Sequence, residues 1–138
     1  INRCLVGSEM CIRDRDYSTN LIEQSKNADL LFHDALSYNM IGRAEDISEI
    51  IQPQLSRVFY DIQGYHASPV EAAQAANEAN VKELIFYHLI PAPDSFIAKI
   101  IFVKGVSEVR PDNWTLADDG TIAILPVNSE DITITNIE

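Results

Sequence analysis

The hydrophobic and polar positions between Gly64 and Pro93 predict a loop, a helix, a buried strand and a second loop. Ser68 is a good N-cap, Pro69 suits the first helical position, and Glu71 lies three residues after the serine. This spacing predicts a capping box at the start of the helix. The helix then carries a stripe of small apolar residues that can lie close to a sheet: Val70, Ala73, Ala76 and Ala79.

Asn80 is predicted to end this helix, because asparagine tolerates the left-handed conformation. The run Leu84–Tyr87 is continuously apolar, which is typical of a strand buried on both faces. His66 therefore precedes the helix and His88 follows the strand. The functional sites of α/β proteins lie at the carboxyl ends of parallel strands, so we interpret this stretch as the best candidate site in the sequence.

An earlier segment has the same helix–strand order. A helix is predicted from cap residues around Asn20 to Ala28, and a strand over Asp29–Phe32 leads into His33 and Asp34. Two parallel strands joined by helical crossovers would place His33 and His88 along one edge of the sheet. The predicted fold class is therefore α/β.

The segment Leu36–Gln63 predicts two helices separated by a turn at Gln52 and Pro53. These helices form either a lid or wall over the site, or a cover for one edge of the sheet. A further helix is predicted to begin at Asp94 and to end at Gly105.

The C-terminal part predicts β-structure. Asp119 and Gly120 separate Trp114–Leu116 from Thr121–Leu125, which predicts a β-hairpin anchored by the tryptophan, and Ile132–Thr135 alternates like an edge strand. The cluster Asp118–Gly120 is interpreted as a turn, since the remaining ligands of a calcium loop are missing.

Composition limits the functional classes. The chain has 138 residues, 46% of them hydrophobic, which is one domain's worth of ordinary globular sequence. The formal net charge of −11 disfavours nucleic acid as a partner, and no apolar run approaches the roughly 20 residues of a membrane span. Cys4 and Cys11 show no zinc-binding spacing.

The N-terminal segment Ile1–Arg15 has no amphipathic period. Its residues Leu5–Asp14 resemble the translation of an adapter used in transposase-based sequencing libraries. Glu9, Arg13 and Asp14 interrupt the apolar core that a secretory signal would need. We therefore expect residues 1–15 to be non-native and residues 16–138 to form a partial domain.

Three short motifs carry a resemblance to a known family. They are H-D-A after the first strand, G-Y-H-A-S-P-V-E-A-A before the capped helix, and Y-H-L-I-P after the second strand. In this order they resemble the C-terminal half of metallo-β-lactamase-fold hydrolases, in particular the ribonuclease Z, arylsulfatase-like and cyclic-nucleotide phosphodiesterase-like branch. The run Phe102–Asp112 is similar to the tail of bacterial members. The resemblance implies half of an αββα sandwich with a mixed sheet and a C-terminal β-hairpin.

The resemblance also implies roles for individual residues. His88 matches the family histidine that binds one of two metal ions, and His66 matches the histidine that contacts the substrate or donates a proton. His33 and Asp34 match a His-Glu pair that supports these groups, with aspartate in place of glutamate. By spacing, the family's metal-bridging aspartate falls on Asp14, within the adapter-like segment.

The implied activity is hydrolysis of a phosphodiester, sulfate ester or related small ester by metal-activated hydroxide. Two divalent ions, zinc or alternatively manganese, would bind the attacking and leaving oxygens. The family's main ligand motif, His-x-His-x-Asp-His, is absent from this chain. We therefore expect the intact parent to be an enzyme and this chain alone to be inactive.

Two alternatives remain open. One is a ribonuclease Z proper, although Leu89-Ile90-Pro91 replaces the Ser-x-Arg that such enzymes tend to have. The other is a non-enzymatic α/β interaction module whose histidines merely end strands. A small-molecule ester is the expected partner, and homo-oligomers are compatible with the sequence, which assigns no cellular compartment.

Overall fold

A computed structural model of the chain describes residues 17–137. The predictions for Ile1–Arg15, including the possible ligand Asp14, lie outside these residues. The elements follow in the order α2 (Thr19–Gln24), β1 (Leu30–Leu36), α3 (Tyr38–Ile51), α4 (Pro53–Ile62), α5 (Pro69–Glu78), β2 (Glu83–Ile90), α6 (Phe96–Phe102), α7 (Val106–Val109), β3 (Trp114–Leu116), β4 (Thr121–Ile124) and β5 (Thr133–Asn136).

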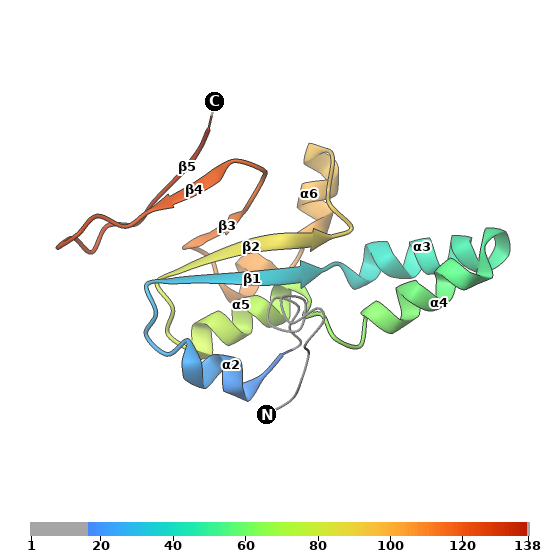
Figure 1. Ribbon diagram of the computed structural model, residues 1–138, viewed down its shortest axis with the longest axis horizontal. Coiled ribbons are helices and arrows are strands. Elements are labelled where there is room, and N and C mark those ends of the chain that lie inside the picture. The colour runs from blue at the N-terminus through green and yellow to red at the C-terminus, as the bar shows by residue number, and fades with distance from the viewer. Residues whose placement is uncertain (1–16, 138) are drawn as a thin grey trace, which may run out of the picture.

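The α/β class is confirmed. Strands β1, β2 and β3 form a parallel sheet in that order, and α5 lies across one face of it (Figure 1). The crossover from β1 to β2 runs through α3, α4 and α5, so the carboxyl ends of the two strands share one edge. The prediction of one mixed sheet needs a correction, because the antiparallel pairing occurs in a separate sheet of β4 and β5.

Helix α5 forms as its sequence predicts. The Ser68 hydroxyl accepts a hydrogen bond from the Glu71 backbone N–H, and the Glu71 carboxylate accepts one from the Ser68 N–H. This reciprocal cap satisfies two backbone donors that the first turn leaves unpaired. Asn80 takes the left-handed conformation after the helix, with φ 54°. The small side chains let α5 pack closely on the sheet. The main apolar cluster includes these alanines and larger side chains from other elements: Ala72, Ala73, Ala76, Ala79, Leu84, Phe86, Phe102 and Val106.

Helices α3 and α4 meet at Gln52, where the predicted break occurs. They pack on each other and project as a helical hairpin beyond the carboxyl ends of β1 and β2 (Figure 1). Most of their large apolar side chains stay exposed, among them Ile50 and Tyr60. The hairpin therefore extends from the edge of the sheet that holds His88, instead of covering that edge with an apolar face.

The predicted hairpin across Asp119 and Gly120 is wrong in its pairing. Strand β3 pairs in parallel with β2, where the Trp114 ring packs on Phe86 with ring centroids 5.9 Å apart. Burial of these side chains favours the central sheet over a local hairpin, so the tryptophan anchors the core. The C-terminal hairpin consists of β4 and β5, and the expected edge strand is β5.

Two smaller differences concern strand and helix ends. His33, Asp34 and His88 lie inside strands, because β1 and β2 both continue further than their apolar runs. The short helix α7 was not predicted from the sequence. Within residues 17–137, no helix is both long enough and apolar enough to cross a bilayer.

Candidate active site at the carboxyl edge of the sheet

Asp34 and His66 form the buried polar centre of this edge. Asp34 is fully buried in β1, and its Oδ2 accepts a hydrogen bond of 2.7 Å from the Nδ1–H of His66. Since a carboxylate can only accept, this bond places the Nδ1 proton on His66. In the neutral ring the lone pair then belongs to Nε2, the atom that can bind a metal or exchange a proton.

The loop before α5 fixes the position of His66. The Leu36 N–H donates to the carbonyl oxygen of Ala67 at 2.8 Å, and the Tyr38 hydroxyl donates to the carbonyl oxygen of His66 at 2.9 Å. Both donors lie at or just after the end of β1. The sequence analysis missed Tyr38, although a tyrosine one residue after a capping serine at a strand end could have marked it.

His88 adopts an unusual backbone conformation. Asp34 is opposite Tyr87 and Ala35 is opposite Leu89, so His88 is an extra residue at a β-bulge. Its φ is 47°, in the left-handed region that a β-carbon disfavours. Bulges redirect side chains, and here the His88 ring lies 5.6 Å from the His66 ring, measured between centroids.

His33 lies next to this pair, and its side chain is buried. Its Nδ1–H donates to the backbone oxygen of Asp34 at 2.7 Å, while its Nε2 has no hydrogen-bond partner among residues 17–137. His33 thus reaches the cluster through Asp34. The sequence prediction that His33, His66 and His88 gather at one edge agrees with this arrangement, and the assigned roles stay predictions.

A pocket of ≈ 380 Å³ opens beside His88, and the turn after β3 forms part of its wall. Pro93 lines the pocket from the loop after β2, and Asp118 and Asp119 line it from the turn. Both carboxylate oxygens of Asp118 accept hydrogen bonds from Lys99 Nζ, at 2.8 and 2.6 Å. The turn is therefore tied to α6, and the Asp118 charge is balanced.

Residues 17–137 do not form a complete metal site. No cluster of three or more histidine, cysteine, aspartate or glutamate side chains suited to a metal ion occurs in residues 17–137. A catalytic zinc ion normally takes three protein ligands, and a structural one takes four. His66 and His88 offer two imidazoles at most, so a complete site requires further ligands.

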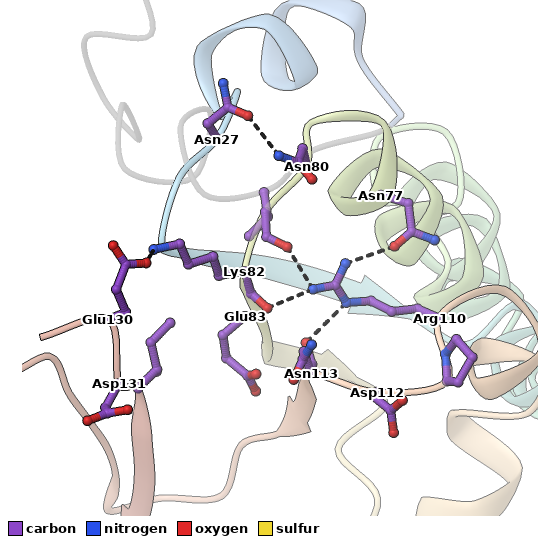
Figure 2. Close-up of a pocket in the computed structure, with 13 residues that line it drawn as sticks. Asn27, Asn77, Asn80, Lys82, Glu83, Arg110, Asp112, Asn113, Glu130 and Asp131 are labelled. Carbon is purple, nitrogen blue, oxygen red and sulfur yellow. Dashed lines mark hydrogen bonds and ion pairs between the residues drawn. The ribbon is translucent and has the colours of Figure 1, made fainter.

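A second, wider basin of ≈ 750 Å³ lies at the opposite edge, where β2 and β3 begin. Figure 2 shows Arg110 at its centre, with hydrogen bonds to the Asn77 side chain and to the carbonyl oxygens of Val81, Lys82 and Asn113. Burial lowers the pKa of Arg110, and the nearby Glu83 opposes this effect. Because backbone carbonyl oxygens already accept hydrogen bonds from its guanidinium, we interpret Arg110 as a structural residue that holds this edge of the sheet together.

No family model matches the chain, and a search of curated proteins gives no match. Among solved structures, the chain is similar to the metallo-β-lactamase-fold protein YhfI from Bacillus subtilis, with 23% identity and a TM-score of 0.48. The match covers 75% of this chain and 34% of that protein, so the chain spans about a third of its length. A likeness of this size does not define an activity.

Proposed function

We propose that residues 16–138 are the C-terminal half of a metallo-β-lactamase-fold hydrolase that cleaves a small phosphodiester, sulfate ester or related ester. The observation that carries this proposal is the meeting of Asp34, His66 and His88 at the carboxyl edge of β1 and β2. The three residues come from separate parts of the chain, and a strained bulge directs one of them to the others.

His66 is the proposed proton donor to the leaving group. Its Nδ1–H bond to Asp34 orients the ring and stabilises it when Nε2 carries a second proton. An imidazole that carries a proton on Nε2 can pass it to a departing oxygen. Tyr38 supports this role by holding the loop that carries His66.

His88 is the proposed metal ligand. His88 lines the pocket beside Pro93 and Asp118, from a backbone position that the bulge fixes. A bound divalent ion, zinc or else manganese, would supply activated hydroxide and neutralise charge on the ester. The other ligands would come from a preceding His-x-His-x-Asp-His segment, which this chain lacks.

A small substrate is favoured over transfer RNA. With a formal net charge of −11, the chain would repel a polyanion over most of its surface. A pure interaction module is disfavoured by the buried His66–Asp34 pair, since burying two such groups costs stability that a binding role does not require.

The test is hydrolysis of bis-p-nitrophenyl phosphate by the chain joined to an N-terminal half that carries a His-x-His-x-Asp-His motif. We expect turnover from the joined protein and none from the 138-residue chain. His66→Ala should lower the rate by about 10²–10⁴, the usual contribution of a general acid. Arg57→Ala, an exposed change on α4, is the control and should leave the rate unchanged. Full turnover by His66→Ala would remove the proposed proton donor.

A further inference from the structure

A groove separates α3 from α6, the helices that follow β1 and β2. Its walls combine apolar side chains with two cations. Met40 and Arg43 line it on the α3 side, and Ile97, Ile101 and Lys104 line it on the α6 side. We name it the α3–α6 groove. It lies outside the Asp34, His66 and His88 cluster, so the proposed function leaves it unexplained.

The groove begins at the edge of the sheet that holds the candidate site. The Ser37 N–H donates to the carbonyl oxygen of Ile90 at 2.8 Å, and α3 begins at the next residue. Ile90 follows His88 by two positions in β2. Figure 1 shows α3 beyond the end of β1 and α6 beside the carboxyl end of β2, near where a substrate reaching out of an α/β site would extend.

The lining has a distinct chemistry. Ile97 is 70% exposed and Ile101 is 45% exposed, so apolar surface is available to a ligand. Arg43 and Lys104 are exposed, and within residues 17–137 neither forms an ion pair or a side-chain hydrogen bond. The residues lining the groove include no carboxylate, although the chain as a whole has a net charge of −11. Two unpaired cations beside apolar side chains suit a ligand that is both apolar and anionic.

We propose that the α3–α6 groove binds the distal part of the substrate, an apolar segment that carries an anionic group. This proposal rests on the proposed function for the reaction itself. It narrows the substrate class to small esters with an apolar, acid-bearing arm. The apolar arm lies against Met40, Ile97 and Ile101, and its anionic group pairs with Arg43 or Lys104.

The test measures binding and requires no turnover. Decanoate and decyltrimethylammonium, both below their micelle concentrations, are titrated into the 138-residue chain by calorimetry. Decanoate should bind more tightly, because its charge complements the two cations. The double change Arg43→Gln with Lys104→Gln should weaken the binding of decanoate by about fivefold, the loss of one exposed ion pair, and should not weaken the binding of decyltrimethylammonium.

Two further variants make the result specific. Ile97→Ser should weaken both probes, since it removes apolar contact from an exposed position without disturbing the core. Arg57→Gln, on the exposed surface of α4, should change neither. His66→Ala should also leave decanoate binding unchanged, so a failure of the proposed chemistry is distinguishable from a failure of the groove.

Several outcomes would overturn the proposal. Equal affinity for the two probes would show that the cations do not select the ligand. Decanoate binding that survives the double change would place the ligand elsewhere. A dimer in sedimentation experiments that the double change disrupts would show that the groove is an interface between copies of this chain.

Discussion

Asp34 and His66 are 32 positions apart in the sequence and share a buried hydrogen bond of 2.7 Å. Each lies at a place that the fold determines. Asp34 is in β1 near its carboxyl end, and His66 is in the loop that leads into the capped helix α5. The bond therefore links the first strand to the helix packed beneath it.

Replacing Asp34 by alanine should destabilise the fold. The change leaves the Nδ1–H of His66 buried without its acceptor, which costs about 3 kcal/mol. Urea unfolding of the chain measures this difference in the free energy of unfolding. Asp112→Ala is the matched control at an exposed position and should change stability by less than about 0.5 kcal/mol. Equal effects of the two changes would mean that the Asp34–His66 bond contributes nothing.

The bulge predicts that glycine is more stable than valine at position 88, the reverse of the order expected in a regular strand. His88→Gly and His88→Val both remove the imidazole, but only valine keeps a β-carbon at φ 47°. The glycine variant should be the more stable of the two by about 1–2 kcal/mol. At the neighbouring Leu89, where φ is not positive, valine should be the more stable. Thermal unfolding of the four variants decides this, and the same order at both positions would argue against strain at His88.

The sequence predicts local elements of this chain well where the signal is local. The capping box of α5, the break at Gln52 and the left-handed Asn80 depend on neighbouring residues, and all three are present. The hairpin across Gly120 was wrong because the pairing of β3 depends on a distant contact between Trp114 and Phe86.

The candidate site was also predicted only in part, because some of its features depend on contacts between distant residues. The parallel pairing of β1 and β2 brings the histidine-bearing segments to one edge, and the repeated helix–strand order predicts this pairing. The bulge at His88 and the hydroxyl of Tyr38 could not be predicted, because each depends on tertiary register. Nothing local in the sequence fixes either of them.

Arg110 should matter for stability although it lies far from the histidines. Arg110→Ala removes the donors to the carbonyl oxygens of Val81, Lys82 and Asn113. Lys82 and Asn113 immediately precede β2 and β3. We expect a loss of about 3 kcal/mol in the free energy of unfolding. Arg57→Ala is the exposed control. A loss as small as that of the control would show that water replaces the guanidinium without cost.

Tyr17 should make the stability of the fold depend on pH in the alkaline range. Its hydroxyl donates to Glu78 Oε1 at 2.7 Å, and this hydrogen bond raises the pKa of Tyr17 above its ordinary value. Because the folded pKa is the higher one, the contribution is fully present below about pH 10 and is lost as pH rises through the folded value. Tyrosinate absorbance should therefore show a late-titrating component that disappears in Tyr17→Phe. Identical titrations would contradict the bond to Glu78.

The metal content of the chain joined to an N-terminal half with a His-x-His-x-Asp-His motif tests the central claim most directly. Elemental analysis should find two divalent ions in the parent, one in His88→Ala and two in His66→Ala, because only His88 is assigned as a ligand. The 138-residue chain alone should bind zinc no better than about micromolar, since one histidine is too few ligands. Two tightly held ions in the 138-residue chain, or two in His88→Ala, would contradict the account.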